Sequence, residues 1–172
     1  NTFPFFNSVK DYRKSEKKSD KINFINLCFK RIKNTINQSF NKNVVFILDV
    51  TGESRHKLIE AIDFFEELNI KNPVILKGQY NWEDFEKTAI DASIDIGSLF
   101  LEGMGNGIWI SSKKNKNKIN ELSFLILQNT RTRIFKTDYI SCPSCGRTKF
   151  DLQKTTSLVK ESTNHLKGLK IS

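Results

Sequence analysis

Short apolar runs alternate with helical patterns through the middle of the chain, and this alternation most constrains the fold. Residues 43–49 form a β-branched and aromatic run that is typical of a buried parallel strand. Residues 73–76, 98–101 and 108–110 are shorter runs of the same kind. We therefore expect an α/β fold in which helices cover a mostly parallel sheet, either barrel-like or open.

The predicted helices carry apolar residues three or four positions apart. The first has its apolar face on Leu58, Ala61, Ile62, Phe65 and Leu68. The second has its face on Trp82, Phe85, Ala89 and Ala92. Two more helices are expected over residues 119–129 and 151–164, and short strands over residues 136–140 and 169–171.

The first 42 residues differ in composition from the rest of the chain. Residues 7–21 are mostly polar and predict a solvated loop, whereas residues 22–36 predict an amphipathic helix. Cys28, inside this helix, is expected to be a small core residue rather than a ligand. We expect three parts: a linker and helix over residues 1–42, an α/β domain over residues 43–135, and the start of a second domain over residues 136–172.

Charge and cysteine content limit the partners and the compartment. The net charge is +9, but residues 1–42 hold ten Lys/Arg against three Asp/Glu, and the remainder holds eighteen against sixteen. Because the excess lies on one flank of a Lys- and Asn-rich chain, we expect no nucleic-acid partner. No apolar run approaches the roughly 20 residues of a membrane span. Three cysteines with one close pair favour a reducing compartment, and the absence of an initial Met suggests that the natural N-terminus lies upstream.

Cys142 and Cys145 are the strongest candidates for chemistry, since thiolates two residues apart can bind one metal ion or cluster. A redox dithiol normally opens a helix after the first strand of a βαβ unit, whereas this pair follows a long α/β region. A zinc ribbon needs a second ligand pair, which Cys28, His56 and His165 do not form. Both histidines are expected on the surface.

Two other motifs allow a binding role and a structural role. Gly103, Gly105 and Gly107 could cradle a phosphate, but they lead into a strand rather than a helix, which favours a tight turn. Arg131 and Arg133 could contact a diphosphate or lie in a solvated loop.

The residues around the cysteines are more specific than the pair itself. The run over residues 138–153, Asp-Tyr-Ile-Ser-Cys-Pro-Ser-Cys-Gly-Arg-Thr-Lys-Phe-Asp-Leu-Gln, closely resembles the 4-hydroxy-3-methylbut-2-enyl diphosphate synthase family. Residues 98–108, 125–133 and 165–171 extend the likeness, which covers about residues 72–172. The α/β region before the motif resembles the inserted barrel-like domain of the large, three-domain form.

The resemblance implies a [4Fe–4S] cluster held by three cysteines and a glutamate in an α+β domain. Cys142 and Cys145 match the first two cysteines, and the remaining ligands are expected just after Ser172. A fragment ending at Ser172 is therefore expected to be inactive alone.

The reaction implied by the resemblance is reductive dehydration and ring opening of 2-C-methyl-D-erythritol 2,4-cyclodiphosphate, with electrons from ferredoxin or flavodoxin. The compartment expected is the bacterial cytoplasm, with the plastid or apicoplast stroma as the alternative. The alternative function is a small zinc-stabilised module that binds nucleic acid.

Overall fold

The fold is taken from a computed structural model of the chain, in which residues 2–28, 32–36, 40–81, 83–113, 116–140, 149–166 and 168–171 are described. The chain divides into two compact units, Asn1–Ile126 and Leu127–Ser172. Each unit is treated below by itself. The domain limits predicted after residues 42 and 135 stay predictions.

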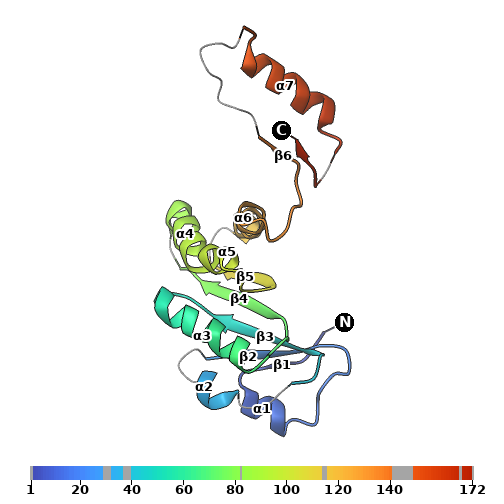
Figure 1. Cartoon of the computed structure of the whole chain (residues 1–172). Coiled ribbons are helices and arrows are strands. Elements are labelled where there is room, and N and C mark those ends of the chain that lie inside the picture. The colour runs from blue at the N-terminus through green and yellow to red at the C-terminus, as the bar shows by residue number, and fades with distance from the viewer. Residues whose placement is uncertain are drawn as a thin grey trace. The chain divides into compact units, whose positions relative to one another are not determined.

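The first unit is built around a five-stranded parallel sheet in which the strands follow chain order (Figure 1). The strands are β1 (Phe5–Phe6), β2 (Asn23–Leu27), β3 (Val44–Asp49), β4 (Val74–Gln79) and β5 (Gly107–Ser111). The helices are α1 (Val9–Lys14), α2 (Ile32–Thr35), α3 (Arg55–Glu67), α4 (Phe85–Ala92), the π-helix η2 (Ser93–Gly97), α5 (Ser98–Leu101) and α6 (Lys116–Asn129). The boundary between the two units falls in the last turn of α6.

The sheet is strongly curved, as a contact between its two outer strands shows. In a flat sheet β1 and β5 would lie about 19 Å apart, four spacings of ~4.8 Å. The rings of Phe5 on β1 and Trp109 on β5 nevertheless pack edge to face with centroids 6.5 Å apart. Sequential parallel order together with this curvature is the arrangement of successive strands in a (β/α) barrel, whereas doubly wound sheets reverse their strand order.

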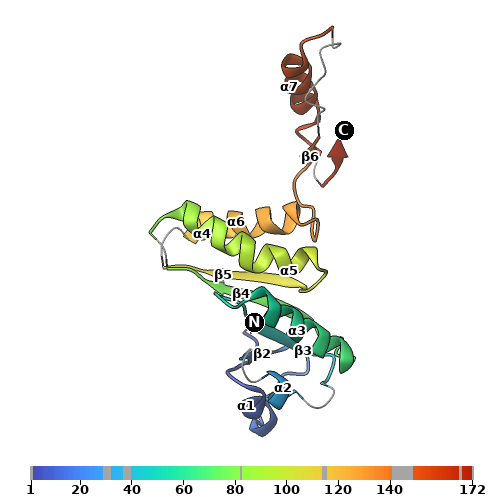
Figure 2. The same cartoon turned by 60° about the vertical axis from the view of Figure 1, so that its left-hand side comes forward.

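The core lies between the sheet and its helices, which are arranged around one side of the sheet (Figure 2). Alternate strand residues point to that side, so Ile25, Phe46 and Leu76 are fully buried. Phe46 packs against Phe65 of α3 with ring centroids 5.9 Å apart. The opposite face is less covered, and Trp109 there is 42% exposed.

The predicted fold class is confirmed, because helices accompany a parallel sheet in the expected order. The strands predicted at residues 43–49, 73–76 and 108–110 are present as β3, β4 and β5. The helix predicted after the first of these is α3, and the helix predicted over residues 119–129 is α6. Ile119, Leu122 and Ile126 form the buried face of α6, as expected.

The strand predicted at residues 98–101 is wrong, since these residues form α5. They continue the helical path of α4 through the π-turn of η2. Leu99 and Phe100 are buried while Leu101 is 72% exposed. A short apolar run does not distinguish a strand from a partly buried helix, and here the preceding helix decides.

The prediction for residues 7–36 is also wrong in two places. Residues 23–27 form strand β2 instead of a helix, with alternate residues buried. The expected loop contains α1, where the Ser8 side chain accepts a hydrogen bond from the Asp11 amide and Tyr12 packs on Phe6. Cys28 is exposed at the end of β2 rather than buried in the core, because the strand ends one residue earlier.

The second unit contains β6 (Asp138–Tyr139), α7 (Leu152–Thr163) and β7 (Lys170–Ile171). The two strands pair in parallel, Asp138 with Lys170 and Tyr139 with Ile171. The predicted strands at residues 136–140 and 169–171 and the predicted helix at residues 151–164 are therefore confirmed. Asp151 caps α7 by accepting a hydrogen bond from the Lys154 amide at 3.0 Å.

Candidate functional site

The segment that contains the cysteine pair connects β6 to α7. Cys142 and Cys145 lie outside the described residues, so their placement is inferred only from the elements on either side. Because β6 and β7 are parallel, the chain leaves both strands at the same edge of the pair. Residues that follow β6 and residues that follow β7 are therefore brought to one edge.

Tyr139 joins β6 to the last turn of α7. The Thr163 hydroxyl donates to the Val159 carbonyl at 2.6 Å, so its single proton is used. The Tyr139 hydroxyl, 2.9 Å from the Thr163 oxygen, must therefore be the donor in that pair. The Lys160 ammonium lies 5.7 Å from the centre of the Tyr139 ring. These contacts fix the strand that leads into the cysteine segment.

Two further hydrogen bonds tie the start of this strand to the segment between α7 and β7. The Thr137 hydroxyl donates to the Leu166 carbonyl at 2.6 Å, and the Asp138 amide donates to the Leu169 carbonyl at 2.8 Å. The entry to the cysteine segment is thus held by side-chain and backbone bonds on both sides of Asp138.

No group of three or more His, Cys, Asp or Glu residues suited to a metal ion occurs among the described residues. Two thiols at the spacing of Cys142 and Cys145 fit two positions of a cluster ligand set. Cys28 belongs to the first unit.

The other candidates from the sequence are surface residues. His56 is 84% exposed in its side chain, and its Nε2 lies 3.3 Å from Glu60 Oε1. His165 is exposed, and so are Arg131 and Arg133 in the turn after α6. The prediction for both histidines is confirmed, and the two arginines face solvent.

The glycine motif before β5 forms a turn, as its sequence favoured. Gly103 and Gly105 adopt φ values of +79° and +94°, which glycine tolerates without steric cost. A Cβ on Gly105 would also lie 2.8 Å from the Leu76 side chain. The Asn106 side chain accepts a hydrogen bond from the Val74 amide at 2.9 Å, which pins the turn to the start of β4.

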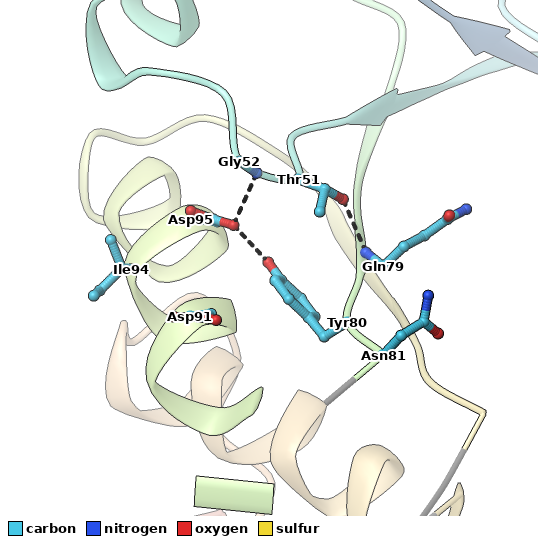
Figure 3. Close-up of a pocket in the computed structure, with 8 residues that line it drawn as sticks. All are labelled: Thr51, Gly52, Gln79, Tyr80, Asn81, Asp91, Ile94 and Asp95. Carbon is cyan, nitrogen blue, oxygen red and sulfur yellow. Dashed lines mark hydrogen bonds between the residues drawn. The ribbon is translucent and has the colours of Figure 1, made fainter. Parts of the chain in front are cut away.

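A cavity of about 410 Å³ lies in the first unit, where β3 and β4 end (Figure 3). It is lined by residues of the β3–α3 turn, the end of β4, and α4 with η2: Thr51, Gly52, Gln79, Tyr80, Asn81, Asp91, Ile94 and Asp95. The carboxyl ends of parallel strands are where α/β folds usually bind ligands.

Asp95 connects the three segments that form this cavity. Its Oδ2 accepts a hydrogen bond from the Tyr80 hydroxyl at 3.0 Å and another from the Gly52 amide at 3.3 Å. Burial raises the pKa of Tyr80 far above its usual range, and the charge of Asp95 adds to that effect. Tyr80 is therefore a neutral hydrogen-bond donor at ordinary pH.

Much of the chain is similar in sequence to one kind of bacterial enzyme. No family model matches the chain. The chain is 50% identical over 100 residues to "4-hydroxy-3-methylbut-2-en-1-yl diphosphate synthase (flavodoxin)" of Porphyromonas gingivalis, covering 58% of this chain and 17% of that protein. It is 43% identical over 143 residues to the protein of the same name from Leptospira interrogans, covering 80% of this chain and 20% of that protein. The resemblance predicted from the sequence is confirmed.

The similarity to these synthases extends to other bacteria. The protein of the same name from Protochlamydia amoebophila is 42% identical over 128 residues, which is 73% of this chain and 19% of that protein. The chain therefore spans about a fifth of the length of the curated synthases it matches. Within the described ranges, no helix has the length and apolar character needed to cross a membrane.

The sequence analysis missed the cavity at the ends of β3 and β4. A signal was present, because Asp49 ends one predicted strand, Thr51 follows it, and Tyr80 lies shortly after the next. Polar residues at the carboxyl ends of neighbouring parallel strands meet at one edge of a sheet. Asp91 and Asp95 are four residues apart, a spacing that puts two side chains on one face of a helix.

Proposed function

We propose that this chain is part of a [4Fe–4S] 4-hydroxy-3-methylbut-2-enyl diphosphate synthase. Its reaction would be the reductive dehydration and ring opening of 2-C-methyl-D-erythritol 2,4-cyclodiphosphate. The observation that carries this proposal is the identity of 42–50% to segments of synthases of that name. The specific run around Cys142 and Cys145 adds the chemical detail that the names alone lack.

Cys142 and Cys145 are proposed as two ligands of the cluster. Support comes from the parallel pairing of β6 and β7, which brings the residues after each strand to the same edge. The family resemblance implies a third cysteine and a glutamate just after Ser172, beyond the end of β7. The segment after β6 and the segment after β7 would thus each supply two ligands to one cluster.

The residues of this chain would hold and orient the ligand thiolates. A bound [4Fe–4S] cluster would supply the two electrons of the reaction one at a time. Metal binding requires deprotonated cysteines, so cluster assembly should be coupled to proton release. The bond from Tyr139 to Thr163 fixes the strand before Cys142, and the Asp151 cap fixes the helix after Cys145.

The remaining parts of the proposal concern the whole protein. Flavodoxin or ferredoxin would deliver the electrons, and the compartment would be the bacterial cytoplasm or, alternatively, a plastid or apicoplast stroma. Residues 43–135 would belong to an inserted barrel-like domain and residues 136–172 to the cluster domain. A chain that ends at Ser172 would be inactive because it lacks two of the four ligands.

The test is anaerobic reconstitution of the full-length protein with iron and sulfide. We expect about four irons and the broad visible absorption of a cluster, both lost together with turnover in Cys142→Ala and in Cys145→Ala. Cys28→Ala is the matched control and should keep the cluster, because Cys28 is exposed at the end of β2.

Three results would contradict the proposal. Retention of a full cluster by Cys142→Ala would remove that residue from the ligand set. Binding of one zinc ion in place of iron, together with affinity for nucleic acid, would support the alternative of a zinc-stabilised module. Turnover by the 172-residue chain alone would refute the ligand count.

A further inference from the structure

The cavity at the ends of β3 and β4 has the size and position of a ligand site. Its volume of about 410 Å³ falls within the range of roughly 300–1,000 Å³ that is usual for small-molecule pockets. It opens at the carboxyl ends of two neighbouring parallel strands, between one βα unit and the next.

The walls of the cavity are held in place before any ligand binds. The Tyr80 ring folds over Gly78, where a Cβ would lie only 2.5 Å from the ring, and this directs its hydroxyl to Asp95. On the opposite wall, the Gln79 amide donates to the Thr51 hydroxyl oxygen at 2.9 Å. Preorganised walls reduce the entropy lost on binding.

Asp95 belongs to η2, a single π-helical turn between α4 and α5. Such turns insert one residue into a helix and are frequent at functional sites. Figure 3 shows Asp95 reaching toward Tyr80 and Gly52 from this helical segment. Asp91 and Ile94 of the same segment also line the cavity, so the helix contributes two carboxylates and an apolar side chain to its wall.

The chemistry of the lining residues selects the class of ligand. Asp91 and Asp95 offer carboxylate oxygens, and Gln79 and Asn81 offer carboxamides. Among the lining residues that the structure describes, none carries a positive charge, while Ile94 and the Tyr80 ring provide apolar surface. Such a site would repel an anion such as a diphosphate and attract a cation with a short hydrocarbon part.

We propose that this cavity binds a small organic cation, a protonated amine on a short apolar chain. The ammonium group lies against Asp91 and Asp95, and the hydrocarbon chain packs on Ile94. The cavity lies in the first unit, whereas Cys142 and Cys145 belong to the second, and the proposal does not depend on the proposed synthase activity. The overall charge of +9 disfavours non-specific binding of cations. Binding of a cation would therefore indicate a specific interaction with the carboxylates of Asp91 and Asp95.

The experiment is an NMR titration of the 172-residue chain with n-butylammonium chloride at constant ionic strength. We expect saturable shifts of the backbone amides of Gly52 and Gln79, and none with sodium butyrate, which has the same chain and the opposite charge. Asp91→Asn should weaken binding about tenfold by removing one charge-assisted contact. Asp63→Asn, which removes an exposed charge from α3, is the matched control and should leave the affinity unchanged.

A second variant keeps the test independent of folding. Ile94 is 63% exposed, so Ile94→Ala should fold normally and weaken binding by about threefold through lost apolar contact. Shifts that grow linearly without saturation, equal shifts with butyrate, or an affinity unaffected by both variants would overturn the proposal. Loss of the cluster in the full-length protein would have no bearing on any of these outcomes.

Discussion

The two units of the chain are stabilised in different ways. In the first unit, strands and helices bury a continuous apolar core in which Ile25, Phe46 and Leu48 are fully inaccessible. In the second unit, α7 has no buried residue, and Phe150 and Leu158 are more than half exposed. The first unit therefore contains a core of its own, whereas the described part of the second depends mainly on hydrogen bonds. A unit with so little buried surface gains most of its stability from a bound metal or from packing against other parts of the protein.

The largest expected effect is removal of the cluster from the reconstituted full-length protein. Because metal binding energy is also folding energy in small metal-binding units, chelation should abolish hydrogen-exchange protection over residues 138–166. Amides of β3 should keep their protection, since their bonds lie in the core of the first unit. Hydrogen exchange followed by mass spectrometry measures both regions in one sample. Equal loss of protection in the two units would show that the second unit depends on the cluster no more than the first does.

The next effect is the truncation of a buried aromatic ring in the first unit. Phe46→Ala should lower the free energy of unfolding by about 3–5 kcal/mol, because it leaves a cavity beside Phe40 and Phe65. Phe150→Ala is the matched change in the second unit, where the ring is 61% exposed, and should cost less than about 1 kcal/mol. Urea unfolding of both variants checks the difference. Similar costs for the two would mean that the second unit has a core of its own.

A smaller effect is expected from the buried phenol at the end of β4. Tyr80→Phe removes the hydrogen bond to Asp95 and should cost about 1–2 kcal/mol at neutral pH, measured by urea unfolding. The folded state raises the pKa of Tyr80, so it holds this proton at a pH where the unfolded chain, with an ordinary value of 10.0, has released it. The stability contributed by Tyr80 is therefore complete below about pH 10 and falls as pH rises further.

The variant also isolates that pH dependence. Above about pH 10 the wild-type first unit should lose stability more steeply than Tyr80→Phe, because the variant has no phenol to ionise there. Tyr139→Phe is a useful control, since its hydroxyl belongs to the second unit. Parallel pH curves for wild type and Tyr80→Phe would show that ionisation of Tyr80 is not coupled to unfolding.

Strands with a strong local pattern of apolar residues were predicted from the sequence, and strands with a weak pattern were not. Strand β3 was predicted because its uninterrupted apolar run is rich in β-branched and aromatic residues, which favour a strand over a helix. Strand β2 was missed because Asn23 and Asn26 interrupt its apolar residues. The spacing of the apolar residues that remain resembles that of an amphipathic helix. Asn23 is nevertheless fully buried, and its side chain donates to the Ser19 carbonyl at 2.6 Å. The pattern of apolar residues in the sequence does not predict that hydrogen bond.

The two candidate sites differ in the same way, since one was predicted from the sequence and the other was not. The cysteine pair was found from sequence because its ligands are neighbours in the chain. The cavity was missed because its parts are distant in sequence: Gly52 and Asp95 are 43 residues apart, and their hydrogen bond exists only once the sheet has formed. A π-turn such as η2 has no strong local signature, so the direction in which Asp95 points depends on tertiary packing.

The smallest effect concerns the bond that holds the entry to the cysteine segment. Tyr139→Phe removes the donor to Thr163 and should cost about 0.5–1.5 kcal/mol, too little to unfold the first unit. If Tyr139 positions Cys142, the reconstituted full-length variant should lose its cluster to a chelator several times faster than the wild type, with a changed electron paramagnetic resonance spectrum of the reduced cluster. Thr163→Val removes the acceptor of the same bond, so the double variant should be no faster than either single variant. Additive rates would show that the two hydroxyls act separately, and an unchanged spectrum in Tyr139→Phe would leave the bond as a local contribution to stability with no part in placing the thiolates.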